Sequence, residues 1–208
     1  MKVLLLNGSP HQTGCTFTAL QEISTVLNRS DIETQILQIG SKLYTGCSAC
    51  GGCQNYDGCV FGDEDGLNQI LHLCAEADGF VFGSPVYYSS PNGTLLSFMD
   101  RLFFAGSKYL RHKPAAAVVS ARRAGTSASL NVLNKYFTIN QMPVVSSTYW
   151  NMVHGSCAED VAKDLEGLQT MRNLGSNMAW LLRCIEAGKQ AGMEPPTAER
   201  GNWTNFIR

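Results

Sequence analysis

Residues 3–10 read Val3-Leu4-Leu5-Leu6-Asn7-Gly8-Ser9-Pro10, a short apolar run that ends in a turn. Consecutive apolar residues followed directly by turn residues are typical of a strand that is buried on both faces. Residues 16–27 then carry apolar side chains at helical spacing, and the two patterns alternate along the rest of the chain. This alternation predicts an α/β fold in which a doubly wound, five-stranded parallel sheet lies between two layers of helices, giving three layers in all.

The expected elements follow from the same pattern. We expect strands over residues 3–6, 34–39, 80–82, 115–119 and 143–145, and helices over 16–27, 66–77, 93–104 and 127–137, with a last helix within 158–187. Outside them lie a cysteine- and glycine-rich loop at 46–62 and a polar tail at 194–208, whose Trp203 and Phe206 we expect to pack on a partner subunit. The length of 208 residues suits one domain over residues 1–208.

Composition excludes several classes of protein. Hydrophobic residues make up 44% of the chain and charged residues 16%, a balance typical of a folded globular protein rather than a disordered one. The net charge of −1 offers no electrostatic footprint for nucleic acid or for an anionic membrane surface. The N-terminal apolar run is too short for a signal peptide, and no stretch approaches the ~20 apolar residues of a membrane span. We therefore expect a cytoplasmic protein whose thiols stay reduced.

The loop after the first strand has the composition of an anion-binding site. In a parallel sheet, ligands bind beyond the carboxyl ends of the strands, where this loop lies. Its candidate phosphate ligands are hydroxyls, a histidine and backbone amides that converge on a helix N-terminus: Ser9, His11, Thr13, Gly14, Cys15, Thr16 and Phe17. The plainer interpretation, one threonine that caps the helix, needs a single hydroxyl, whereas the loop offers three. The loop matches neither a Walker A sequence nor the Gly-rich dinucleotide fingerprint.

Two further loops at the same edge supply a candidate ring site. The loop after the third strand has a stiff backbone and flat side chains that suit a planar heteroaromatic ring: Pro85, Val86, Tyr87 and Tyr88. The loop after the fourth strand offers positive charge for a reduced ring or a substrate phosphate: Arg122, Arg123 and Gly125. Interface tyrosines and surface arginines are the plainer alternatives. A phosphate loop beside a ring loop predicts a mononucleotide site.

These two loops resemble those of the flavodoxin-fold NAD(P)H-dependent FMN reductases. The resemblance rests on Gly8-Ser9-Pro10 with Thr16 and on Gly83-Ser84-Pro85-Val86-Tyr87, and it extends from Met1 to about Trp180. It implies bound FMN, the flavodoxin-like strand order 2-1-3-4-5, and NAD(P)H as a transient reductant. It also implies a quinone, a free flavin or a similar small-molecule acceptor. Because the flavin carries the chemistry, no catalytic acid or base is expected.

Four of the eight cysteines lie close together, at Cys47, Cys50, Cys53 and Cys59. So compact a run lets one loop surround a [4Fe–4S] cluster, and the small residues between the cysteines let backbone amides approach the sulfurs. The spacing resembles that of the iron–sulfur flavoproteins. A zinc site and a metal-free loop remain as alternatives, although structural zinc loops usually bring two separated pairs. Cys74 and Cys184 lie at apolar helix positions, where we expect them in the core.

Three functions are compatible with these features. The first is an FMN-dependent oxidoreductase that passes electrons from NAD(P)H to a small-molecule acceptor. The second is an iron–sulfur flavoprotein electron-transfer module, in which a [4Fe–4S] cluster takes electrons from a ferredoxin-like donor. Resemblance to that subfamily implies a homodimer or homotetramer. The third is a non-catalytic flavodoxin-fold binding protein, which would not require the tyrosine-rich ring loop.

Overall fold

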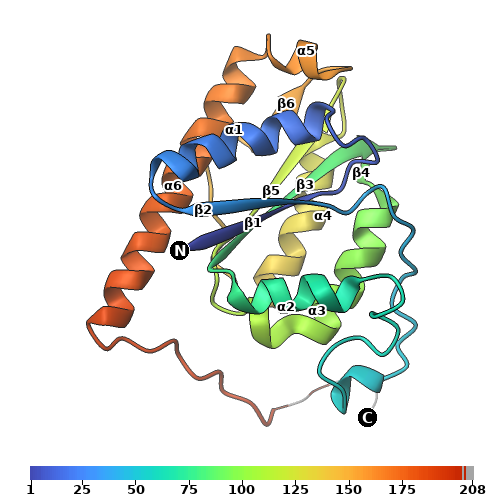
Figure 1. The fold of residues 1–208 in the computed structure, drawn as a ribbon, viewed down its shortest axis with the longest axis vertical. Coiled ribbons are helices and arrows are strands. Elements are labelled where there is room, and N and C mark those ends of the chain that lie inside the picture. Colours follow the sequence, from blue (N-terminus) through green and yellow to red (C-terminus); the bar gives the residue numbers. More distant parts are fainter. Residues whose placement is uncertain (203, 205–208) are drawn as a thin grey trace.

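The computed structural model describes residues 1–202 and 204 (Figure 1). Helices and strands alternate along the chain, as the apolar pattern predicts. Their bounds in chain order are β1 (Lys2–Asn7), α1 (Cys15–Arg29), β2 (Glu33–Gln38), η1 (Gly52–Gln54), α2 (Leu67–Glu76), β3 (Gly79–Tyr87), β4 (Ser90–Pro91), α3 (Gly93–Leu110), β5 (Ala115–Ala121), α4 (Thr126–Ile139), β6 (Met152–His154), α5 (Ala158–Val161) and α6 (Leu165–Gln190).

The strands form a sheet in the order β2-β1-β3-β5-β6, and all of these neighbours are parallel. The short β4 adds an antiparallel hairpin to the end of β3, with Val86 opposite Pro91. Counted over the parallel strands alone, this is the predicted order 2-1-3-4-5, and the predicted flavodoxin-like fold class is confirmed. The hairpin was not predicted from the sequence.

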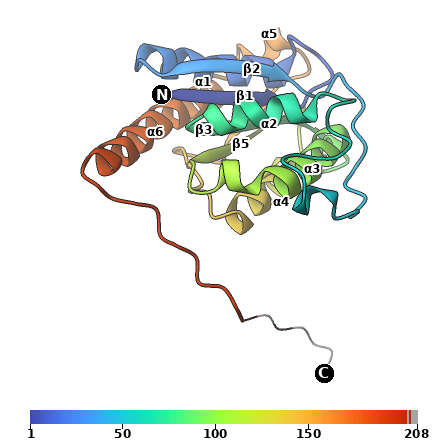
Figure 2. The same ribbon diagram turned by 60° about the horizontal axis from the view of Figure 1, so that its bottom comes forward.

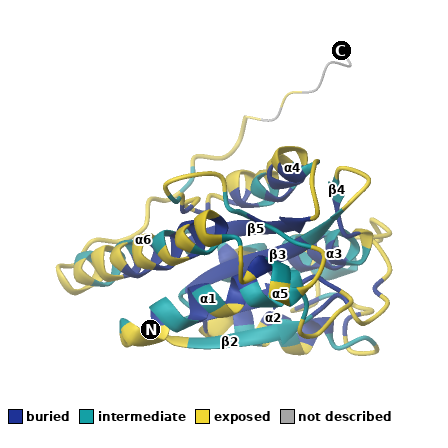
Figure 3. Cartoon of the chain, turned by 90° about the horizontal axis from the view of Figure 1, so that it is seen from above, coloured by how far each residue is buried: buried dark blue, intermediate teal, exposed yellow. Residues whose placement is uncertain are grey.

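Both faces of the sheet are covered by helices (Figure 1). Side chains of β1 alternate between two cores: Leu4 and Leu6 pack with α2, α3 and α4, while Val3 and Leu5 pack with α1 and α6. Because successive strand residues point to opposite faces, a run without polar residues is what a sheet covered on both sides requires. Viewed from above, β5 and β3 are largely buried, the edge strand β2 is of intermediate burial, and the outer helix surfaces are exposed (Figure 3).

The fifth strand does not lie where the sequence analysis placed it. Residues 143–145 make only an isolated bridge, between Val144 and Ala115, and the regular pairing with β5 falls on β6 instead. Between these two points, the side-chain amide of Asn151 donates to the carbonyl of Ala117 at 3.1 Å. A side-chain amide thus takes the place of a backbone amide beside β5. This edge of the sheet therefore forms without the continuous apolar run by which a strand is recognised in a sequence.

The last helical region also differs from the expectation. It consists of α5 and α6, with Asp164 capping α6 by accepting from Gly167 N at 2.9 Å. Cys74 is buried in the core as predicted, but Cys184 is exposed, because it lies on the outer side of α6. After α6 no helix or strand follows up to residue 202 (Figure 2). Trp203 and Phe206 lie outside the described residues.

Candidate functional site

A cavity of about 660 Å³ lies at the carboxyl edge of the sheet, as the topology rule predicts. The β1–α1 loop, the end of β3, the end of β5 and the segment after β6 line it. The structure brings together there these predicted cofactor residues: Ser9, His11, Thr13, Gly14, Cys15, Thr16, Pro85, Val86, Tyr87 and Arg122. Four other candidates do not line it: Phe17, Tyr88, Arg123 and Gly125.

The β1–α1 loop is shaped by hydrogen bonds from Asn7. Its Oδ1 accepts from Ser9 N at 3.1 Å, and its Nδ2 donates to Gln38 Oε1 at 2.7 Å. Helix α1 then begins after Gly14 without a side-chain cap and without an acidic residue in its first turn. The first amides of a helix have no carbonyl partner within it, so they are available to an anion at this terminus.

Thr16 lines the cavity and also makes a buried contact with β5. It is buried, and its hydroxyl lies 2.8 Å from the hydroxyl of Ser120. The pair joins the first turn of α1 to the end of β5. The Thr16 hydroxyl therefore holds together two of the elements that line the cavity, whereas Thr13 is exposed.

Gly125 supports the ring loop from outside the cavity. Its φ is +92°, a left-handed conformation that favours glycine, and a Cβ there would lie 2.8 Å from the Cα of Ser89. Ser89 and Tyr88 form the tip of the β3–β4 hairpin, both with positive φ. Tyr88 is fully exposed at this tip, and Tyr87 is partly exposed beside the cavity.

Residues after β6 complete the cavity and were missed from the sequence. They are Gly155, Ser156, Cys157, Ala158 and Glu159. The thiol of Cys15 donates to Gly155 O at 3.5 Å, and burial raises the pKa of that thiol. A fifth strand placed at residues 152–154 would have put this segment at the carboxyl edge of the sheet. Because the sequence analysis placed that strand at 143–145, residues 155–159 were not recognised as candidates.

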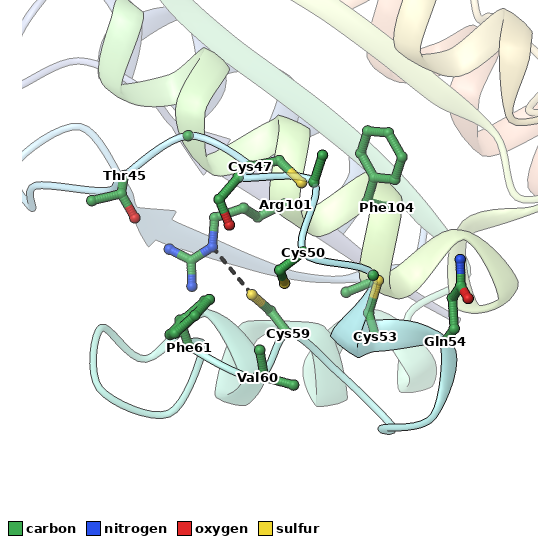
Figure 4. A pocket seen from close by; sticks show the side chains of 15 residues that line it. Thr45, Cys47, Cys50, Cys53, Gln54, Cys59, Val60, Phe61, Arg101 and Phe104 are labelled. Carbon is green, nitrogen blue, oxygen red and sulfur yellow. Dashed lines mark hydrogen bonds between the residues drawn. The ribbon is translucent and has the colours of Figure 1, made fainter.

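A second cavity, of about 710 Å³, is lined by all four cysteines of the predicted cluster loop (Figure 4). Cys47 and Cys50 are exposed, while Cys53 and Cys59 are partly buried. Arg101 and Phe104 of α3 also line it; Arg101 is buried and Phe104 is exposed. The four thiols thus surround one hollow between the loop and α3.

Residues 1–156, most of the chain, match the protein family described as NADPH-dependent FMN reductase. The chain belongs to this family. An iron-sulfur flavoprotein of Methanocaldococcus jannaschii is 30% identical to this FMN reductase family member, over 89% of the chain and 100% of the relative. Membership supports an FMN-dependent oxidoreductase.

Solved structures share the fold of this FMN reductase family member. A flavodoxin from the domain Archaea matches with a TM-score of 0.60 at 15% identity, over 88% of this chain and 99% of its own. An NADH:FMN oxidoreductase in its apo form matches with a TM-score of 0.63 at 17% identity, over 86% and 89%. At such identities the likeness establishes the flavodoxin-like architecture alone.

The carboxyl-edge cavity of the FMN reductase family member fits a phosphate that is bound by backbone amides. Arg122 supplies a cation to the lining, and Glu159 supplies a carboxylate. The Cys157 thiol donates to Glu159 and lowers the pKa of that carboxyl, which is already ionised at neutral pH. Because the two side-chain charges offset each other, the N-terminus of α1 is the feature that favours an anion.

The backbone of one cysteine in the cysteine cavity, Cys59, is held in place by a side chain. Asn68 of α2 holds the backbone of Cys59 on both sides: its Oδ1 accepts from Cys59 N at 2.9 Å, and its Nδ2 donates to Cys59 O at 3.0 Å. Asn68 is itself buried. Among the described residues, no three histidine, cysteine, aspartate or glutamate side chains converge on a point that would hold a single metal ion.

Within that described part, no helix combines the length and the apolar character that a bilayer crossing requires.

Proposed function

We propose that this protein is an electron-transfer flavoprotein that holds FMN at the carboxyl edge of the sheet and a [4Fe–4S] cluster between Cys47, Cys50, Cys53 and Cys59. The observation that carries the proposal is the single cavity that all four cysteines line. A multi-iron cluster takes its ligands from around its outside, so thiols that surround a hollow suit it better than thiols that meet at a point. The names of the curated relatives add support.

The protein's own residues define the FMN site. The first amides of α1 receive the phosphate, and Pro85, Val86 and Tyr87 face the ring. When bound, FMN supplies the capacity to take up and release electrons, which no side chain of the site has. The fixed geometry of the loop, held by Asn7 and by the Thr16–Ser120 contact, positions that group.

Electrons enter from a ferredoxin-like donor in this proposal. Apolar side chains at the mouth of the cysteine cavity are exposed and suit a protein surface: Val60, Phe61 and Phe104. We also propose a homodimer or homotetramer, as the resemblance to the iron–sulfur flavoproteins implies. Direct reduction by NADPH is the second candidate, and the description of the matched family favours it.

Iron and sulfide assays with a visible spectrum, on anaerobically purified protein, test the cofactors. We expect flavin bands and about four irons per chain. Cys50→Ser should lose the iron and keep FMN, since Cys50 lines the cysteine cavity and not the carboxyl-edge cavity. Cys184→Ser, which changes an exposed cysteine outside that cavity, should keep both. Full iron content in the Cys50→Ser protein would reject the proposed cluster site.

The electron donor is tested on the same two proteins. A reduced ferredoxin should bleach the flavin of the unchanged protein much faster than that of the Cys50→Ser variant. NADPH that bleaches both proteins equally fast would favour the second candidate, because that reduction bypasses the cysteine cavity.

A further inference from the structure

Arg101 is a buried cation beside the cysteine cavity. Its side chain is 3% exposed, and it lines the cavity from the middle of α3. A buried charge is costly unless it is paired and hydrogen-bonded, so its partners indicate what it is placed to do.

Two of the three guanidinium nitrogens have partners. Nη1 donates to the Asp65 carboxylate in an ion pair, and Nε donates to Sγ of Cys59 at 3.3 Å (Figure 4). Asp65 is in turn fixed, because its other oxygen accepts from Leu67 N at 3.2 Å, at the start of α2. The ion pair with Asp65 thus orients the guanidinium toward Cys59.

The third nitrogen, Nη2, is buried and has no hydrogen-bond partner. The hydroxyl of Tyr44, whose ring packs on Phe98 one turn earlier in α3, is also buried without a partner. Buried donors without acceptors are rare, and each one calls for an explanation. Both atoms are closed off from the cavity, so the contact of Nε with Cys59 is the feature that links Arg101 to the cysteines.

The contact with Cys59 has a direct electrostatic consequence. Hydrogen bonds and positive charge at the sulfurs of an iron–sulfur cluster stabilise its reduced form, which carries one more negative charge. Asn68 already holds the backbone of Cys59 on both sides. The backbone of Cys59 is held in place and the guanidinium is oriented toward its sulfur. The positive charge of Arg101 therefore lies at a fixed position beside this cysteine.

We propose that Arg101 is a positioning residue that raises the reduction potential of the group held by the four cysteines, by donating from Nε to Cys59 and by holding its positive charge beside that sulfur. The proposal rests on the cluster site of the proposed function. Beyond that function, it identifies a residue that sets the reduction potential of the site. The plainer alternative is a structural ion pair between Arg101 and Asp65 alone.

Redox titration of three iron-loaded proteins, followed by visible absorbance, separates these alternatives: the unchanged chain, Arg101→Gln and Lys108→Gln. Lys108 lies two turns further along α3, is exposed, and pairs with Asp57 rather than with a cysteine. At the midpoint of the unchanged protein, we expect the reduced-to-oxidised ratio of Arg101→Gln to fall about tenfold, equal to about 59 mV for one electron. Lys108→Gln should stay within about twofold.

A second substitution covers the case in which Arg101→Gln does not fold or load. Arg101→Lys keeps the charge but lacks the forked donor, so its ratio should fall by about threefold. Loaded, folded Arg101→Gln or Arg101→Lys protein with the unchanged potential would overturn the inference and leave the cluster proposal intact. An unchanged chain that takes up no iron would instead reject the cluster, and the inference with it.

Discussion

Asn92 joins the β1–α1 loop, the end of β3 and the start of α3 with one residue. Its Oδ1 accepts from Thr94 N at 3.0 Å as the N-cap of α3, and its Nδ2 donates to the buried carbonyl of Gly8 at 2.7 Å. Its own N–H donates to the hydroxyl of Ser84 at 2.9 Å. A helix cap and a backbone acceptor of the proposed phosphate loop therefore depend on the same amide.

Asn92→Ala should lower the free energy of unfolding by about 2–4 kcal/mol. The lost cap accounts for about 1 kcal/mol, and the unpaired Gly8 carbonyl for about 1–3 kcal/mol. Asn92→Ser should lose less, because serine caps the helix but does not reach Gly8. Urea denaturation measures all three proteins. An alanine variant within about 0.5 kcal/mol of the unchanged protein would contradict this role for Asn92.

The buried thiol of Cys74 makes stability depend on alkaline pH. Burial raises its pKa from the ordinary 9.0 to about 12. Above pH 9 the unfolded chain releases a proton that the folded chain still holds, so the free energy of unfolding falls as the pH rises toward 12. The slope reaches about 1.4 kcal/mol per pH unit.

Comparison of the unchanged protein with Cys74→Ala isolates this thiol. Between pH 8 and pH 10.5, the unchanged protein should lose about 1–2 kcal/mol more than the variant in urea denaturation. Lys113, which donates to Cys74 O at 2.9 Å and whose pKa burial lowers, is present in both proteins, so the difference reports the Cys74 thiol together with its charge interaction with Lys113. Equal losses would mean that the thiol is accessible to water in the folded state.

At the scale of elements, one residue of α2 controls the segment that carries Cys59. Besides its two bonds to the Cys59 backbone, Asn68 Nδ2 donates to Asp63 Oδ1 at 2.8 Å. Gly58 and Gly62 pack against the same amide, since a Cβ at either would lie within 2.7 Å of its Oδ1. The whole turn from 58 to 63 is therefore built around Asn68.

Asn68→Ala should release this turn while the sheet stays intact. Because hydrogen exchange follows local opening, the amides of residues 58–63 should exchange at least about tenfold faster, and those of β1 at the unchanged rate. Gln69→Ala, which removes the exposed neighbouring side chain, is the matched control. Faster exchange in β1 as well would indicate loss of the whole fold rather than of the turn.

The elements also show why part of this structure could be predicted from sequence. β1 and β3 were predictable because buried parallel strands leave uninterrupted apolar runs, followed by recognisable turn residues. β6 was not, because it pairs over only three residues and Asn151 replaces part of its ladder. Arg101 left no sequence signal: its partners Asp65 and Cys59 lie 36 and 42 residues away. Such pairs become visible only when α2 and α3 are packed together.

At the scale of the whole molecule, FMN should stabilise the fold through its phosphate. A ligand that binds only the folded state at a hundredfold excess over its Kd adds about 2.7 kcal/mol. For a chain of this size that raises the Tm by about 5–10 °C. Riboflavin, which lacks the phosphate, should give a much smaller shift at the same concentration, as differential scanning fluorimetry would measure. Equal shifts would argue that the N-terminus of α1 does not bind the phosphate.

The position of β1 within the sheet also governs the order of events during synthesis. Its first neighbour begins at Glu33, but its second begins only at Gly79, roughly 75 residues after Val3. At about 5–20 residues per second, the ribosome needs roughly 4–15 s to make that partner available. Throughout that interval Val3, Leu4, Leu5 and Leu6 have one side without a strand, so residues that are fully buried in the finished protein stay partly uncovered in the nascent chain.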